Sequence, residues 1–236
     1  MSLPVGVLTD CTLVCLGGLF GTLLKRFVSR KEADQITVFL GFCSIAISVT
    51  SIIRVYAMPP VIFSVIIGTV IGMFCRLESK VQGLAENCVF RFFVRKEQAE
   101  GYDITKLVTV VVIFCASGFG LYGVLMEGMS GDSSVLLSKA ALDFCTAVVF
   151  GSALGAVVAA IALPMLLIML ALYSLSAMLG PFISAEALQN FMACGGILTL
   201  AAAMRMTGIK VTAITNMVPA LVLVIPLTNL WQQLPL

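Results

Sequence analysis

Three ionisable residues lie inside long apolar stretches of the chain. Asp10 falls in Leu3–Leu24, and Lys139 and Asp143 fall one helical turn apart in Ser134–Ala160. At the centre of a membrane helix such side chains cost about 2.5–3.5 kcal/mol on insertion scales, so they must face protein or water. The chemistry that these residues suggest is the binding or passage of a hydrophilic solute, an ion or a proton.

The three residues also have plainer interpretations. Lys139 and Asp143 have opposite charge at i,i+4, so they can form an intrahelical ion pair instead of lining a solute or proton path. Asp10 has no charged neighbour in its own segment. It must therefore find Lys139, a cation or a cavity, or stay protonated.

A glycine-rich stretch interrupts the end of the fourth apolar segment and forms a second candidate site. Ser117, Gly118 and Gly120 could unwind a helix and expose carbonyl oxygens to a cation, because glycine adopts unusual backbone angles. Glu127 and Asp132 come next, on the predicted outer side, and suggest a vestibule that attracts cations. The alternative is glycine packing followed by a turn in which residues 132–134 cap the next helix.

Asn216 lies just before Pro219, at the start of the last apolar segment. Proline at the first turn is typical of a helix start, so Asn216 either caps that helix or presents its oxygen to an ion beside a broken helix.

The composition excludes most other classes of protein. Of 236 residues, 60% are hydrophobic and 11% are charged, which is too apolar for a soluble globule. The net charge of +2 argues against a nucleic-acid binder, and the absence of histidine removes the usual catalytic triads and most zinc sites. The chain lacks HExxH and GxSxG motifs, so we expect no enzyme, no catalytic residue, no metal and no cofactor.

The positions of the candidate residues require a bundle of membrane helices. We predict an all-α, polytopic transmembrane domain that occupies residues 1–236, with about eight spans, or seven if the first or fifth segment is re-entrant. We expect the long uncharged stretch to fold back at Ala162–Pro164. The predicted spans are Leu3–Leu24, Ile36–Ile53, Val61–Cys75, Leu107–Met126, Ser134–Ala160, Leu163–Leu179, Leu188–Met206 and Val211–Leu230.

With eight spans, most lysines and arginines fall on one side, which the positive-inside rule makes cytoplasmic. Both termini are then expected in the periplasm of a bacterial inner membrane. Residues 77–97 carry apolar residues at helical spacing with basic residues on other faces, which predicts an amphipathic helix on the cytoplasmic membrane surface.

Two parts of the chain have a similar order of features. Spans two to three and seven to eight each comprise a glycine-containing helix, a short turn with a basic residue and a helix that opens with proline. If spans 1–3 match spans 6–8, the two units face opposite ways, as in the inverted repeats of many transporters.

Several motifs together resemble one known family. They are LGGLFG (Leu16–Gly21), FCASGFGLYGVLMEGMSGDSSVLLSKAALDF (Phe114–Phe144), GGILTLAAAMRMTGIK (Gly195–Lys210) and NMVPALVL (Asn216–Leu223). The chain is similar, end to end, to the YqgA-like bacterial inner-membrane proteins, a family of unknown function that has been described speculatively as a sodium channel or pump. The resemblance implies a transporter-like role for the motif residues. The family usually has Asn where Asp10 stands and often Gln where Met169 stands.

Three functions remain open from the sequence. The first is an ion-coupled secondary transporter of a small solute or monovalent cation. The second is a cation channel, although no repeated selectivity-filter motif is present, and the third is a non-transporting scaffold or sensor. Besides the lipid bilayer we expect a homodimer partner, because glycine-rich faces on a small bundle suit helix association.

Overall fold

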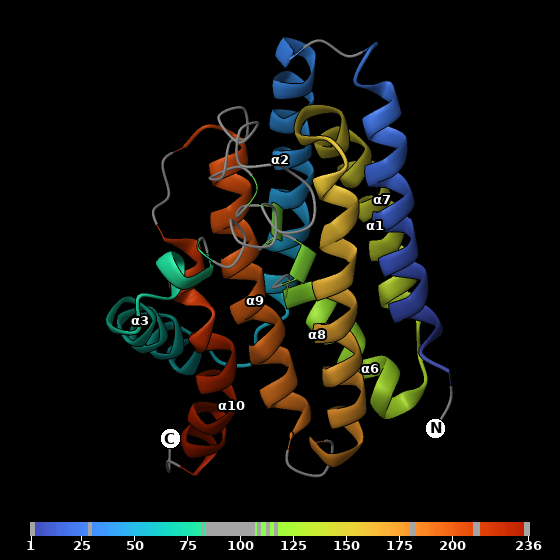
Figure 1. Cartoon of the computed structure of the whole chain (residues 1–236). Coiled ribbons are helices and arrows are strands. Elements are labelled where there is room, and N and C mark those ends of the chain that lie inside the picture. Colours follow the sequence, from blue (N-terminus) through green and yellow to red (C-terminus); the bar gives the residue numbers. More distant parts are fainter. Residues whose placement is uncertain are drawn as a thin grey trace.

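The computed structural model describes residues 3–27, 30–81, 83, 107, 110–111, 114–115, 118–179, 183–209 and 213–233. The regular elements in these residues are helices, and most lie lengthwise beside one another, whereas α3 is seen nearly end-on (Figure 1). They are α1 (Val5–Leu24), α2 (Arg30–Ile53), α3 (Met58–Phe74), α6 (Gly118–Ser130), α7 (Ser134–Leu154), α8 (Val157–Leu179), α9 (Ala185–Met206), η3 (Ile214–Met217) and α10 (Pro219–Gln232). The predicted all-α bundle is confirmed.

Six segments of the described chain are long and apolar enough to cross a membrane. They belong to α1, α2, α7, α8, α9 and the combined η3–α10 segment, while the apolar helix α3 has 17 residues. α6 covers the end of the fourth predicted span, and half of the first ten residues of that span lie outside the described residues. The chain is a multi-pass membrane protein, and six to eight spans fit the described helices.

The surface of the bundle carries many large apolar side chains, and polar residues are buried within its largely apolar core. Phe20 and Leu167 are 52% and 62% exposed, whereas Ser48 is fully buried. So many exposed large apolar side chains are unusual in a soluble protein and suit helices whose outer faces meet lipid.

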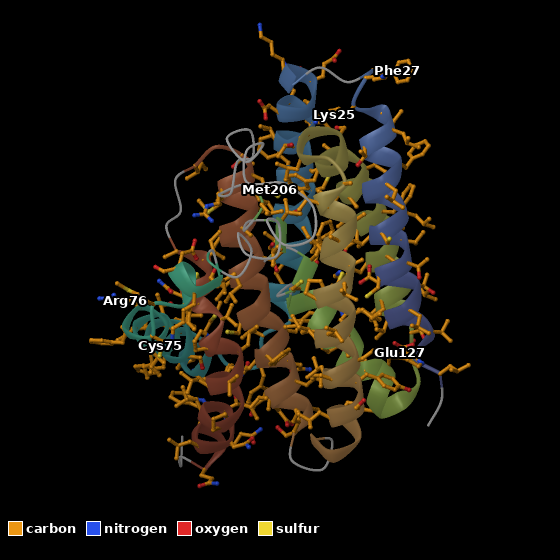
Figure 2. The ribbon with its side chains drawn as sticks, in the orientation of Figure 1. Lys25, Phe27, Cys75, Arg76, Glu127 and Met206 are labelled. Atoms are coloured by element: carbon orange, nitrogen blue, oxygen red, sulfur yellow. The ribbon has the colours of Figure 1, made fainter. Side chains whose placement is uncertain are left out.

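The start of α1 and the end of α10 lie at the same end of the bundle (Figure 1). Lys25 and Phe27, which follow α1, lie at the opposite end, and Glu127 lies toward the end where α1 starts (Figure 2). A chain that starts and ends at the same end of the bundle crosses it an even number of times.

The predicted turn between the fifth and sixth spans is misplaced. α7 ends at Leu154, and Gly155 breaks the chain with φ of 81° while its N–H donates to the carbonyl of Gly151. Glycine adopts this left-handed conformation readily and commonly ends a helix. Pro164, where we expected the turn, lies inside α8 on an exposed face. The left-handed glycine, and not the proline, is the effective helix stop.

α2 and α9 contact each other through two matching glycine sites. Gly41 of α2 packs against α9, and Gly196 of α9 packs against α2. Each glycine meets the seventh, tenth and eleventh residues after the other one, as a twofold axis between the two helices requires. These residues are Ala203, Met206 and Thr207 at Gly41, and Ser48, Ser51 and Ile52 at Gly196.

The other two helix pairs of the predicted repeat are also in contact, because α1 packs on α8 and α3 packs on α10. The contacts therefore support an inverted repeat of spans 1–3 and 6–8. Of the predicted amphipathic helix, residues 77–81 are helical, and nearly all of the remainder lies outside the described residues.

Candidate functional site

A seam of glycines brings α1 against α7. A Cβ on Gly17 would lie 2.7 Å from the carbonyl oxygen of Phe144, and a Cβ on Gly21 would overlap that of Val148. On the other side of the seam, a Cβ on Gly151 would lie 2.5 Å from the carbonyl oxygen of Gly18. Only residues without side chains allow backbones to approach so closely. The seam holds Asp10 on α1 opposite the polar face of α7.

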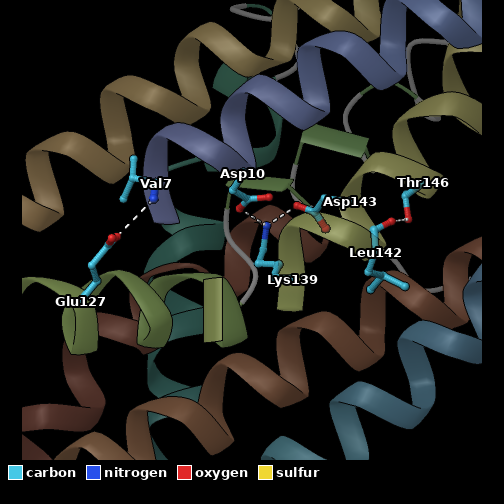
Figure 3. A network of polar contacts seen from close by, with 7 residues as sticks. All are labelled: Val7, Asp10, Glu127, Lys139, Leu142, Asp143 and Thr146. Carbon is cyan, nitrogen blue, oxygen red and sulfur yellow. Dashed lines mark hydrogen bonds and ion pairs between the residues drawn. The ribbon is translucent and has the colours of Figure 1, made fainter. Parts of the chain in front are cut away.

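Asp10, Lys139 and Asp143 meet at this interface and form what we call the charged triad. The ammonium of Lys139 donates to Asp10 Oδ2 at 2.9 Å, across the two helices, and also to Asp143 Oδ2 within α7 (Figure 3). Asp10 is fully buried, and Lys139 and Asp143 are each 4% exposed. The intrahelical ion pair predicted from the i,i+4 spacing is confirmed. Of the partners considered for Asp10, the structure shows Lys139.

Neighbouring residues shape the space around the triad. The aliphatic stem of Lys139 runs over Gly120 of α6, where a Cβ would lie 2.6 Å from Lys139 Cε. Cys11 follows Asp10 in α1, and the thiols of Cys11 and Cys115 are both buried in the same apolar cluster. Gly120 thus makes room for the lysine, which is a packing role that the sequence analysis did not assign to it.

The triad contains more acid than base. Two carboxylates share one ammonium, and Asp10 Oδ1 has no hydrogen-bond partner among the described residues. A buried carboxylate oxygen without a donor, in a group with net negative charge, is costly because nothing replaces its lost hydration. This imbalance is the chemically unusual feature of the site.

Glu127 lies at the end of the bundle where α1 starts, which is the predicted outer side, but its side chain is buried. It is 2% exposed, and its carboxylate accepts the backbone N–H groups of Gly6 at 2.6 Å and Val7 at 3.2 Å, together with the Ser133 hydroxyl at 2.8 Å. These N–H groups belong to the first turn of α1, where the helix dipole favours an anion. Glu127 therefore caps α1 from the end of α6, and its role in an ion path stays a prediction.

Asp132 lies on the exposed turn between α6 and α7. Its Oδ1 accepts the N–H of Ser134 at 2.9 Å, and hydrogen bonding from Ser134 holds the pKa of the Asp132 carboxyl below its usual range. Ser133 is the N-cap residue, but its hydroxyl turns to Glu127 instead of capping α7. The predicted cap is thus formed by Asp132 alone.

The expected unwinding of the glycine-rich stretch is not seen where the structure describes it. Gly118 and Gly120 lie in the first turn of α6 and are helical. Ser117, the other candidate there, lies outside the described residues. The structure therefore brings Gly120 to the charged triad but gives no support for exposed carbonyls between Gly118 and Gly120.

Asn216 lies in η3, beside the break that precedes α10, as expected. Its Oδ1 accepts the N–H of Glu78 at 3.0 Å, and Glu78 Oε2 in return accepts the N–H of Thr215 at 3.0 Å. The guanidinium of Arg205 lies 3.8 Å from Glu78 Oε1. This reciprocal pair, which joins the start of the last span to the chain after α3, is remote in sequence from the triad.

Two polar residues with structural roles were missed by the sequence analysis. Glu78 was counted only as part of the amphipathic segment, and its pairing with Asn216 joins positions 138 residues apart. Asn190 is fully buried in α9, and its Oδ1 accepts the N–H groups of Tyr56 and Ala57 just before α3. The signal that the sequence offered for Asn190 was a polar amide inside the apolar segment Leu188–Met206.

Comparison with known proteins places the chain in a family. The model of a family described as "Protein of unknown function (DUF554)" matches residues 5–229. The chain belongs to the DUF554 family. It is 35% identical over 230 residues to "Uncharacterized protein YqgA" of Escherichia coli (strain K12), and the match covers 96% of this chain and 97% of that protein. The predicted resemblance is confirmed.

A second relative is more distant. The chain is 25% identical over 224 residues to "Uncharacterized membrane protein YdfK" of Bacillus subtilis (strain 168), covering 92% of this chain and 93% of the relative. No solved structure matches the chain. The family description names no activity, so any more specific function has to be argued from the geometry of the site.

Proposed function

We propose that this protein is an ion-coupled secondary transporter of a small solute or a monovalent cation, with the charged triad as its ion site. The observation that carries the proposal is the pairing of two buried carboxylates with a single ammonium between α1 and α7. Ionisable groups inside membrane bundles are costly to retain and typically mark ion or proton pathways.

The architecture supports a carrier. The matching glycine contacts of α2 and α9 fit an inverted repeat, and the segment that crosses the membrane last is broken at η3. Transporters built from inverted repeats expose one site alternately to the two sides by moving one unit against the other. The sequence has no repeated selectivity-filter motif, which favours a carrier over the channel alternative.

The remaining expectations are part of the same proposal. The protein lies in a bacterial inner membrane with both termini in the periplasm, forms a homodimer and catalyses no covalent reaction. The small solute or monovalent cation is its functional partner.

Reconstitution into liposomes tests the transport proposal. Purified protein is supplied with labelled sodium, and separately with a panel of labelled amino acids and carboxylic acids, under imposed proton or sodium gradients. We expect gradient-driven uptake by the wild type and its loss in Asp143→Asn, since this variant removes one of the two acids. Uptake is measured by filtration and counting.

The control is Asp34→Asn, the same chemical change at an exposed position of α2. It should leave uptake as in the wild type. Equal uptake by Asp143→Asn and wild type, or no uptake above empty liposomes for any compound under any gradient, would contradict the proposal.

A further inference from the structure

The charged triad lacks one positive charge. With both carboxyls ionised and Lys139 protonated its net charge is −1, and all three side chains are at most 4% exposed. A net charge buried in a low-dielectric interior is strongly disfavoured unless a further charge compensates it. The site is electrically complete only when it holds one more cation.

The helices that pack around the triad do not supply that charge from their described residues. α1 adds only the thiols of Cys11 and Cys15 near Asp10, and α8 carries no acidic or basic residue, its one phenol being Tyr173. The acid of α6, Glu127, is engaged with the start of α1, and Cys115 precedes that helix. The charges of α2 lie in its first two turns, at Arg30, Lys31, Glu32 and Asp34.

The geometry favours a proton as the missing cation. The position between the two carboxylates is already filled by the Lys139 ammonium, which would repel a metal ion placed beside it. The thiols of Cys11 and Cys115 are poor ligands for hard cations such as sodium, which prefer several oxygens. A proton needs a single oxygen, and Asp10 Oδ1 is a buried oxygen without a partner among the described residues.

We infer that Asp10 and Asp143 together bind one proton, and that this proton, and not a metal ion, is the coupling ion of the transporter. The second half of the inference rests on the proposed function. Because the two acids interact through the same ammonium, the proton belongs to the pair and not to either residue alone.

Proton binding acts on the contact between two helices. Lys139 is joined to Asp143 within α7, but its bond to Asp10 is the one that crosses to α1. When the pair loses its proton, both acids compete for the ammonium with full charge. When the pair is protonated, one of the two bonds weakens. Gain or loss of the proton therefore changes how firmly α1 is tied to α7.

Infrared difference spectroscopy tests the proton directly, without any transport measurement. The purified wild type in lipid nanodiscs is compared in H₂O and D₂O at about pH 8, far above the ordinary pKa of a carboxyl. We expect the isotope-sensitive carbonyl stretching band of one protonated carboxylic acid, unchanged when sodium replaces potassium in the buffer.

Single substitutions assign the band to the triad. Asp10→Asn and Asp143→Asn each leave one acid for one ammonium, so the band should vanish in both. Lys139→Met leaves two acids without a base, so the band should grow about twofold. The exposed matched control, Asp34→Asn, should keep the wild-type band.

The possible results separate this inference from the transport proposal. A wild type without the band, or with a band that appears only when sodium is removed, overturns the proton inference and points to a metal ion instead. A band that survives both Asp10→Asn and Asp143→Asn overturns it as well. If the band behaves as expected but no compound is taken up by liposomes, the proton site stands and the transport proposal fails.

Discussion

Two buried acidic regions join α1 to the α6–α7 part of the molecule, and they solve the problem of a buried charge differently. Glu127 receives two backbone N–H groups and a hydroxyl, whereas Asp10 and Asp143 share one ammonium. Fixed dipoles at a helix start satisfy an anion at all times. One ammonium shared by two acids cannot compensate both charges. The Glu127 site is therefore suited to stabilising the fold, and the charged triad is suited to gaining and losing an ion.

Among substitutions in these two regions, we expect Lys139→Met to lower the stability of the protein most. The variant removes the only basic group of the triad, and loss of one partner from a buried ion pair costs about 3–5 kcal/mol. We expect a large fall in the thermal unfolding temperature of the protein in detergent, measured by the exposure of buried cysteine thiols to a fluorescent maleimide.

A triple variant provides the control. Asp10→Asn and Asp143→Asn combined with Lys139→Met remove all three charges, and most of the stability should return because neutral groups cost less to bury. A Lys139→Met protein that unfolds at the wild-type temperature would mean that the ammonium adds nothing to the contact between α1 and α7.

An intermediate effect is expected from Glu127→Gln. The amide keeps one carbonyl acceptor but loses the charge at the start of α1, which costs about 1–2 kcal/mol. We expect a moderate fall in unfolding temperature, with the carboxylic acid band of the triad unaltered in the infrared spectrum.

This variant also decides between capping and the ion path that the sequence suggested for Glu127. If Glu127→Gln retained wild-type stability but lost ion-driven uptake as Asp143→Asn is expected to, then Glu127 would belong to the path and the contrast between the two regions would fail.

The smallest effect is expected from Glu78→Gln, at the junction before the last span. The amide can still accept the N–H of Thr215, but the 3.8 Å ion pair with Arg205 is lost. Both side chains of this pair are partly exposed, so we expect a loss of about 0.5–1 kcal/mol. The fluorescence of the single tryptophan, Trp231 at the end of α10, reports the unfolding. A change as large as that of Lys139→Met would show that this junction, too, is essential.

Local signals in the sequence predicted most of the spans and one of the two ion pairs of the charged triad. Apolar length located the spans, and the i,i+4 spacing located the pairing of Lys139 with Asp143, because both are properties of short segments. The cap of Glu127 on α1 joins residues 120 and 121 positions apart, so only tertiary packing reveals it. The turn was misplaced because proline was weighted above Gly155, whose left-handed backbone cannot be inferred from its residue type.

The paired glycines Gly41 and Gly196 have a mechanical consequence for α2 and α9. Two crossing helices that pack tightly at two symmetrically placed glycines can pivot between those two contacts. Any tilt of one helix on the other that parts them near one membrane surface presses them together near the opposite surface. In the proposed carrier, this symmetry would couple the opening of one side of the bundle to the closing of the other.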